Sequence, residues 1–345
     1  MNLLESADFI APSHAATKTP GSLEALCFDN RYTDELPGDP DTQNRRRQVL
    51  GACYSLVKPT PVAAPKLVAY SREVADLLGL SAKTCQSDTF AQVFTGNHLL
   101  PGMQPYAMCY GGHQFGNWAG QLGDGRAILL GEVRNSRGEK WDLQLKGSGL
   151  TPFSRDGDGR AVLRSTVREY LCGEAMHGLG IPSTRSLCLF GSQEEVYRER
   201  IESGAMLLRM APSHVRFGSF EVFYYRSQFD RLQRLADYVI EHHYSDLRGC
   251  AEPYLELLRQ VVRRTARLIA QWQLAGFAHG VMNTDNMSVL GLTLDYRTGD
   301  IGQPPNTLNG GATDFLGNSE PKYRRIEDYE IFSPDGKRDL KAEFV

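Results

Sequence analysis

The segment that decides the fold is His279-Gly280-Val281-Met282-Asn283-Thr284-Asp285-Asn286, with Asp295 nine residues after its end. It follows residues 254–275, where apolar side chains recur at helical spacing, and Gly276 stands where a helix would end in the left-handed conformation. Residues 287–294 have the pattern of two short strands separated by a glycine turn. The sequence therefore predicts a long helix, a polar loop, a small hairpin and a terminal aspartate, in that order.

This order of elements is typical of the catalytic half of a kinase-like domain, where an asparagine and an aspartate hold a divalent cation on the phosphates of a nucleotide. Asn286 and Asp295 are the candidates for those two ligands. If Asn286 has that role, the kinase base position falls on Val281, which cannot accept a proton, so the candidate base is Asp285. The alternative interpretation is an ordinary surface loop in which asparagine and aspartate cap turns.

Composition excludes several classes of function. A chain of 345 residues with a formal net charge of −3 can bury one large or two small cores and has no electrostatic reason to bind nucleic acid. It contains no run of 18 apolar residues, so no membrane span is expected, and its first residues lack the basic start of a signal peptide. The seven cysteines form no CxxC pair, which favours buried, reduced thiols and a cytoplasmic location over a disulfide framework or a zinc site.

A glycine-rich stretch at residues 111–126 precedes two predicted strands, at 127–133 and 140–146. The second strand alternates apolar and polar side chains and ends in Lys146. A glycine-rich turn followed by a hairpin and a lysine is the geometry that covers the phosphates of a nucleotide and contacts them with one ammonium group. Glycine alone serves any tight turn, so the lysine-bearing strand carries most of this inference.

A helix is predicted at residues 161–179, where the following Gly180 and Pro182 end it. Glu169 within it is the natural partner for Lys146, because an ion pair would orient the ammonium and offset the cost of burying it. The alternative is an exposed glutamate that pairs within its own helix.

Two arginines, Arg209 and Arg216, stand among apolar and aromatic neighbours. Arginines in such surroundings need an anion, and phosphate is a good bidentate match. The alternative is a pair of structural salt bridges to Glu221 or Asp230.

Three further elements complete the secondary-structure prediction. Two strands are expected at residues 184–190 and 195–198, and a helix is expected at residues 228–243. His242 and His243, at the end of that helix, are expected to face solvent and not to bind metal.

Taken together, the glycine-rich stretch and residues 143–149, 216–221 and 279–286 resemble the selenoprotein O family. The resemblance covers about residues 22–296 and implies an α+β, bilobal protein-kinase-like fold, with a β-rich N-lobe and a helical C-lobe. The domain boundaries expected on this basis are a flexible tail at 1–20, an N-lobe at 21–226 and a partial C-lobe at 227–296.

The resemblance also implies an activity, the transfer of AMP (or UMP) from a nucleotide to Ser, Thr or Tyr hydroxyls of proteins, with Mg²⁺ or Mn²⁺. ATP would bind in a flipped orientation relative to kinases, so that its α-phosphate faces the acceptor. Asp285 would be the base, while Asn286 and Asp295 would hold the metal. The nucleotide-binding residues that the resemblance implies are Gly123, Gly125, Arg126, Lys146, Asp158, Gly159, Glu169, Arg209, Arg216 and Asp295.

The resemblance ends after Tyr296, and residues 297–345 are expected to form a divergent, irregular tail that leaves the C-lobe incomplete. One face of the helix at 254–275 is then expected to be exposed. Two other functions stay open at this point: a protein or small-molecule phosphotransferase, and an ATP-binding protein without turnover.

Overall fold

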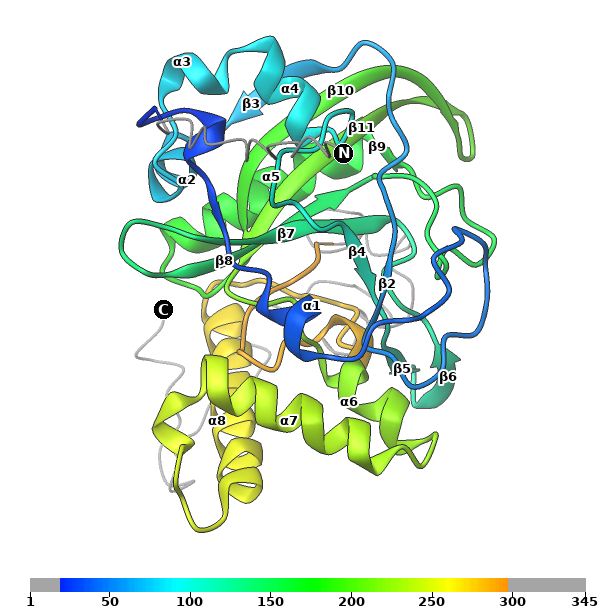
Figure 1. Ribbon diagram of the computed structural model, residues 1–345, viewed down its shortest axis with the longest axis vertical. Helices are drawn as coiled ribbons and strands as arrows, with labels where there is room; N and C mark the ends of the chain where they lie inside the picture. The colour runs from blue at the N-terminus through cyan, green and yellow to red at the C-terminus, as the bar shows by residue number, and fades with distance from the viewer. Residues whose placement is uncertain (1–18, 297–345) are drawn as a thin grey trace, which may run out of the picture.

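The computed structural model describes residues 19–296, which form the expected α+β fold around one large antiparallel sheet (Figure 1). Within these residues, two short strands pair at the side of the sheet. Strand β1 (Cys27–Phe28) pairs with β7 (Ala127–Arg134), and β9 (Ala161–Val162) pairs with β11 (Ile201–Ala211). A separate hairpin consists of β5 (Gly111–Gln114) and β6 (Asn117–Gln121). The remaining strands, in spatial order, are β2 (Tyr54–Leu56), β4 (Tyr106–Met108), β7 (Ala127–Arg134), β8 (Lys140–Lys146), β11 (Ile201–Ala211), β10 (Arg185–Tyr197) and β3 (Lys66–Tyr70).

Helices pack against the sheet in separate groups (Figure 1). Helices α2, α3 and α4 share one hydrophobic core with β8 and β11, α5 packs on β10 and β11, and α7 shares a second core with β4 and β7. No helix in the described part of the chain has the length and apolar composition needed to cross a membrane. The helices are α1 (Arg31–Glu35), α2 (Arg72–Leu77), α3 (Ala82–Cys85), α4 (Asp88–Phe94), α5 (Leu163–Gly178), α6 (Phe217–Tyr224), α7 (Phe229–His243) and α8 (Pro253–Leu274), with 3₁₀ turns η1 (Leu23–Ala25), η2 (Ser245–Leu247) and η3 (Thr284–Asn286).

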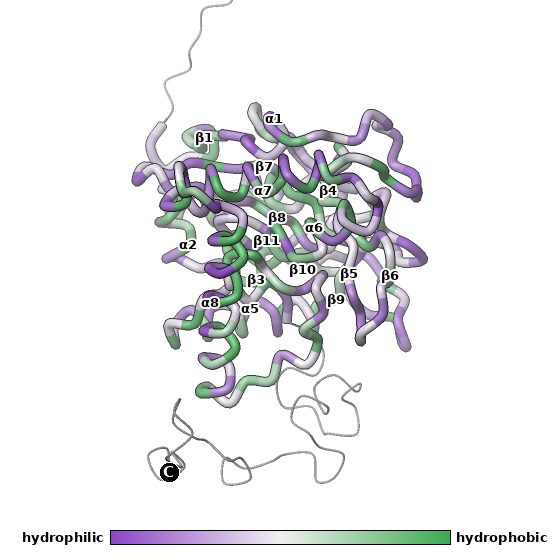
Figure 2. The backbone as a smooth tube through the Cα atoms, turned by 90° about the horizontal axis from the view of Figure 1, so that it is seen from below, coloured by the Kyte–Doolittle hydropathy of each residue, from purple (hydrophilic) through white to green (hydrophobic). Residues whose placement is uncertain are grey.

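Strand β8 confirms the predicted alternation, and both of its faces are covered. Its apolar side chains pack into the core shared with α2–α4, and the tube of β8 runs through the interior of the molecule (Figure 2). Its polar side chains, Asp142, Gln144 and Lys146, point to the opposite face and are buried as well. Because buried polar groups need partners, this face is where the buried ion pairs of the molecule form.

Helix α8 anchors the loop that follows it. The helix begins with Pro253 at its first position and ends before Gly276, whose φ of +68° confirms the predicted left-handed end. The buried Trp272 donates its indole N–H to Thr293 Oγ1 at 2.9 Å, and its ring stacks on His279 at 5.0 Å. His279 Nε2 lies 3.1 Å from the carbonyl oxygen of Asp295, which can only accept, so Nε2 carries the proton. The helix thereby fixes both ends of the loop 279–295.

Two strand predictions are corrected. Residues 287–294 turn back on themselves with a single bridge, Met287 to Thr293, and do not form two strands. Backbone hydrogen bonds to two neighbouring segments hold this short hairpin, from Phe217 N–H to the carbonyl oxygen of Met287 and from Thr184 N–H to that of Thr293. The strands predicted at 184–190 and 195–198 are one continuous strand, β10, with an irregular register between Gly191 and Glu195 that the sequence pattern showed as a break.

The prediction that His242 and His243 face solvent is wrong. His242 Nε2 lies 2.8 Å from Glu35 Oε2 of α1, and both histidines are half-buried. Burial lowers the pKa of His243 to about 3, so it is neutral at physiological pH. The helical pattern alone did not show that α1 and the end of α7 meet.

The cysteines form no disulfide in the described residues. Two of them, Cys27 on the short strand β1 and Cys250 in a loop, are exposed, so the prediction of buried thiols is wrong for this pair. The buried thiols are Cys53, Cys85, Cys109, Cys172 and Cys188.

The exposed face expected on the long helix is present on α8. Leu258 and Val262 are 60% and 58% exposed, and hydrophobic and hydrophilic segments alternate along the tube of α8 (Figure 2). The division into lobes at residue 226 stays a prediction. Residues 1–18 of the tail predicted at 1–20, and the whole tail predicted at 297–345, lie outside the described residues.

Two glycines let the hairpin β5–β6 approach α6 closely. A Cβ atom on Gly218 of α6 would lie 2.0 Å from the carbonyl oxygen of Gly111, and a Cβ on Gly112 would lie 2.9 Å from Cβ of Asp285. Side chains at these positions would push the hairpin away from the loop that carries Asp285. Glycine is required here because backbones meet.

Gly218→Ala should therefore lower the free energy of unfolding by about 1–3 kcal/mol, the usual cost of overpacking. Gly178→Ala is the matched control, because Gly178 is also helical but has open space around it, and alanine there should be neutral or slightly stabilising. Urea unfolding followed by circular dichroism measures both. Equal midpoints for the two variants would contradict the close approach.

Candidate active site

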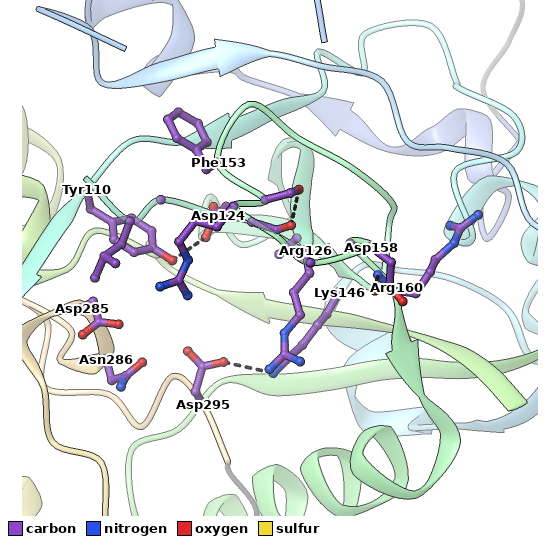
Figure 3. A pocket seen from close by; sticks show the side chains of 18 of the residues that line it. Tyr110, Asp124, Arg126, Lys146, Phe153, Asp158, Arg160, Asp285, Asn286 and Asp295 are labelled. Atoms are coloured by element: carbon purple, nitrogen blue, oxygen red, sulfur yellow. Dashed lines mark hydrogen bonds and ion pairs between the residues drawn. The ribbon is translucent and has the colours of Figure 1, made fainter. Parts of the chain in front are cut away.

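Most of the predicted site residues line one cavity of about 590 Å³ (Figure 3). Its lining comes from β8, β11, the start of α6, the loop 279–295 and the glycine-rich segments around residues 123–126 and 153–160. Figure 3 shows Asp285, Asn286 and Asp295 on one side of this cavity, with Lys146 next to Asp295. Every predicted site residue lines the cavity except Glu169, which lies directly behind Lys146.

Lys146 is held between two carboxylates. Its ammonium forms an ion pair with Glu169 Oε2, as the sequence predicted, and lies 3.1 Å from Asp295 Oδ1. Glu169 is buried, so the alternative of an exposed glutamate is wrong. Burial lowers the pKa of Lys146, and the two carboxylates oppose that shift. The result is a lysine that is fixed in place at the wall of the cavity.

Arg209 joins the same network from strand β11. Its Nη1 lies 2.7 Å from Glu169 Oε1 and 2.8 Å from Asp295 Oδ1, while its Nε donates to Gln144 Oε1 at 2.7 Å. Burial acts to lower the pKa of Arg209, but Asp295 and Glu169 outweigh it and raise that pKa. The fully buried guanidinium therefore stays charged.

Arg216 completes the cluster from the N-cap of α6. Its Nη1 lies 2.9 Å from Asp295 Oδ2 and donates to the carbonyl oxygen of Asp285 at 2.9 Å, and its guanidinium lies 5.0 Å from the ring centre of Tyr110. Its Nε has no hydrogen-bond partner among residues 19–296. Both arginines pair with Asp295. The predicted alternative is therefore wrong, since it placed their salt bridges on Glu221 or Asp230.

The short turn η3 places Asp285 and Asn286 side by side at the cavity. Asp285 Oδ2 accepts a hydrogen bond from Gln114 Nε2 at 3.1 Å, and Asn286 Nδ2 donates to the carbonyl oxygen of Val281 at 3.0 Å. Val281, at the kinase base position, thus contributes only its backbone to this contact. Asp285 is the carboxylate that the loop presents next to the metal-ligand candidates.

The predicted glycines have a packing role that the sequence did not show. A Cβ on Gly123 would lie 2.4 Å from the ring of Phe153, and one on Gly125 would lie 2.7 Å from the carbonyl oxygen of Phe153. Gly159 has a φ of +73°, and a Cβ atom on it would lie 2.1 Å from the backbone of Gly149. The three glycines bring two loops together under the cavity, and Arg126 extends into it (Figure 3).

Asp158 holds the side chain of Arg198 and the backbone of Arg160. Its carboxylate lies 2.8 Å from Arg198 Nη1 and accepts the backbone N–H of Arg160 at 2.9 Å. The hydrogen bond from Arg198 lowers the pKa of Asp158, so the carboxylate is ionised. The cations Arg155, Arg160 and Arg198 line this end of the cavity and were not predicted from the sequence.

Two further residues were missed. Asp124 is buried, accepts the hydroxyl hydrogen of Tyr110 at 3.1 Å and lies 4.0 Å from Arg216, and burial raises the pKa of its carboxyl. Gln114 orients Asp285, as described above. Both stand inside the glycine-rich stretch, so their position between glycines was the available signal.

The donor set fits a magnesium ion that arrives with a nucleotide. No cluster of three or more His, Cys, Asp or Glu side chains suited to a metal occurs in the described residues. Asn286 and Asp295 line the same cavity and offer the hard oxygen donors that Mg²⁺ prefers. Mg²⁺ is usually held by one or two carboxylates together with substrate phosphates, so two protein ligands are sufficient.

Comparison with known proteins shows the family of this chain. The family model described as Protein adenylyltransferase SelO matches residues 42–299. The chain belongs to the SelO family. It is 53% identical over 317 residues to the protein nucleotidyltransferase YdiU of Aromatoleum aromaticum, and 57% and 58% identical over 275 residues to the proteins of that name from Thiobacillus denitrificans and Myxococcus xanthus.

The match covers most of this chain but only part of its relatives. The match with the Aromatoleum protein covers 87% of this chain and 61% of that protein. The matches with the Thiobacillus and Myxococcus proteins each cover 80% of this chain and 54% of the relative. All predicted site residues fall inside the matched range 42–299.

The ion-pair network yields a stability prediction. Glu169→Gln leaves the buried Lys146 and Arg209 short of one anion and should lower the free energy of unfolding by about 3–5 kcal/mol. The double variant Glu169→Gln/Lys146→Met removes one cation as well, so it should recover a large part of that loss. Denaturant titration of the two variants and the parent chain provides the measurement.

Glu139→Gln is the matched control, because Glu139 pairs with Arg137 and both side chains are about half-exposed, so the substitution should cost less than about 1 kcal/mol. If Glu169→Gln were no more destabilising than this control, the buried network would not be a single charge-balanced unit.

Proposed function

We propose that this chain transfers a nucleotidyl group, AMP from ATP, to the hydroxyl group of a Ser, Thr or Tyr side chain of a protein. The observation that carries the proposal is the convergence of Lys146, Arg209 and Arg216 on Asp295, in a cavity that Asp285 also lines. Membership of the SelO family and the names of the relatives support nucleotidyl transfer.

In the proposed reaction the acceptor oxygen forms a bond to the α-phosphorus, and the bond from that phosphorus to the bridging oxygen of pyrophosphate breaks. Asp285 takes the hydroxyl proton, and Gln114 holds its carboxylate in place. Lys146, Arg209 and Arg216 offset the charge that develops on the phosphate oxygens and on the leaving pyrophosphate. Asn286 and Asp295 would hold Mg²⁺, which neutralises phosphate charge when it is bound.

A flipped nucleotide accounts for the position of the base. The kinase base position is Val281, which has no acceptor on its side chain, whereas Asp285 stands four residues later in the same loop. A nucleotide that presents its α-phosphate near Asp285 needs no carboxylate at position 281. The cations near Asp158 would then be available to the other end of the ligand.

The direct test is label transfer. We expect protein labelling from ATP labelled at the α-phosphate and none from ATP labelled at the γ-phosphate. Asp285→Asn should reduce the rate of transfer by about 10²–10⁴-fold, the usual worth of a general base, while ATP affinity changes little. Filter binding and calorimetry measure the two quantities.

Asp230→Asn is the control, since Asp230 is a carboxylate on the surface of α7 with 74% of its side chain exposed. Labelling from the γ-phosphate would identify a phosphotransferase instead. If the parent chain binds ATP and labels protein from neither position, a binding function without turnover replaces this proposal.

The variant Asp295→Asn should distinguish the binding of the metal from the binding of the nucleotide. Asp295 pairs with Lys146, Arg209 and Arg216 in the wall of the cavity, so its neutralisation leaves these cations more positive charge for phosphate while it removes a proposed metal ligand. The variant should bind metal-free ATP at least as tightly as the parent chain, and Mg²⁺ should no longer strengthen binding. Calorimetry with and without Mg²⁺ measures this, and an unchanged Mg²⁺ effect would place the ion elsewhere.

A further inference from the structure

A second cavity, of about 340 Å³, lies next to the candidate active site. It is lined by residues 113, 115 and 116 of the hairpin β5–β6 and by residues 280–284 of the loop that carries Asp285. Its volume is at the lower end of the usual range for ligand pockets, about 300–1,000 Å³. The active-site chemistry described above uses none of its side chains.

The two cavities are lined by neighbouring residues of the same two chain segments. Thr284 lines the second cavity and the next residue, Asp285, lines the first. On the hairpin, Gln114 donates to Asp285, while its neighbours His113 and Phe115 line the second cavity. An extended polypeptide advances about 3.3 Å per residue, so side chains close in sequence on one acceptor can reach both cavities.

Phe115 is an unusual residue for its position. It is 66% exposed and has a φ of +52°, and the following Gly116 has a φ of +82°. Gln114 and Asn117 pair across this two-residue turn, which requires positive φ at both central positions and favours asparagine followed by glycine. A bulky side chain there is strained, and with two thirds of its surface exposed it gains little from burial within the described structure. Strain of this kind at an exposed aromatic residue indicates a function outside folding.

The polar groups of the second cavity are already engaged within the protein. His113 Nδ1 lies 3.0 Å from Glu221 Oε1, and its Nε2 lies 3.1 Å from the hydroxyl oxygen of Tyr225. Thr284 Oγ1 donates to Glu221 Oε2 at 2.5 Å and accepts the backbone N–H of His113 at 2.7 Å. Asn283 Oδ1 accepts the backbone N–H of Phe115 at 3.2 Å. These bonds hold the hairpin against the loop.

The surface left for a ligand is apolar. Phe115, Val281 and Met282 supply side-chain carbon and sulfur atoms, and Gly116 and Gly280 leave room between them. Val281 and Met282 are only half-buried, and methionine adapts its shape to different apolar partners. This lining suits an apolar side chain better than a charged or strongly polar one.

We propose that this second cavity is a docking site for the acceptor polypeptide, and that it takes an apolar or aromatic side chain close in sequence to the hydroxyl that receives the nucleotidyl group. The proposal rests on the proposed function, because it names the substrate recognised beside the same site. Phe115 is the specificity-determining residue, and its strained turn is the structural cost of presenting it.

The test uses fluorescent peptides of eleven residues with one serine in a glycine and alanine background. One series carries a single leucine or phenylalanine within three residues of the serine, and the matched peptide carries alanine instead. Fluorescence anisotropy with the full chain and α,β-methylene ATP should show about tenfold tighter binding of the best apolar peptide, a difference typical of one buried anchor residue.

Phe115→Asn should abolish that preference, and its melting temperature should be equal to or above that of the parent chain, because asparagine suits the turn. Phe229→Asn is the matched control, since Phe229 is also exposed, at 57%, and lies on α7 away from both cavities. This control should keep the preference for the apolar peptide.

Equal binding of apolar and alanine peptides by the parent chain would overturn the proposal. A lower melting temperature for Phe115→Asn would mean that another segment of this chain packs on Phe115. A change of mass in light scattering would mean that a second copy of the chain packs there. Either result would overturn the docking proposal. The two hypotheses remain separable: peptide preference without α-phosphate transfer would reject nucleotidyl transfer but retain the docking site.

Discussion

Three cations share one carboxylate at the centre of this molecule, and the rest of the site depends on that contact. Asp295 holds Lys146 from β8, Arg209 from β11 and Arg216 from the start of α6 within about one hydrogen-bond length. The loop 279–295 is thereby fixed to the sheet and to α6 at once. Trp272 of α8 secures the other side of the same loop through Thr293 and His279. The loop that carries the candidate base is therefore held from two sides.

The charges of this centre are matched within the protein. Lys146, Arg209 and Arg216 face the carboxylates of Glu169 and Asp295, and Asp124 lies 4.0 Å from Arg216. This pairing offsets the cost of burying the three cations. A polyphosphate that binds only the folded chain would stabilise it further, so stability and ligand affinity are coupled here.

The glycine-rich stretch combines two functions that its composition did not separate. Gly123 and Gly125 allow a close approach to Phe153, so they shape the floor of the cavity. Gly111 and Gly112 belong to the hairpin β5–β6, which packs on α6 and on the backbone near Asp285. The first pair lies where the sequence predicts a contact with phosphate, and that contact stays a prediction, whereas the second pair lies close to the candidate base, Asp285. The same residue type is needed in both places because backbones approach closely in both.

The sequence by itself determined the local elements and the chemistry of the site: the alternation on β8, the end of α8 at Gly276, and the identity of Lys146, Glu169, Asp285 and Asp295 as candidates. These follow from short-range periodicity and from residue types that suit one chemistry. Only the tertiary structure decided which carboxylate the two arginines pair with, because Arg209 and Arg216 meet Asp295 across about 80 residues of chain and not the nearer Glu221 or Asp230. It also decided that Gln114 supports Asp285 and that Phe115 stands beside a second cavity, since long-range packing, which no local pattern encodes, sets both contacts.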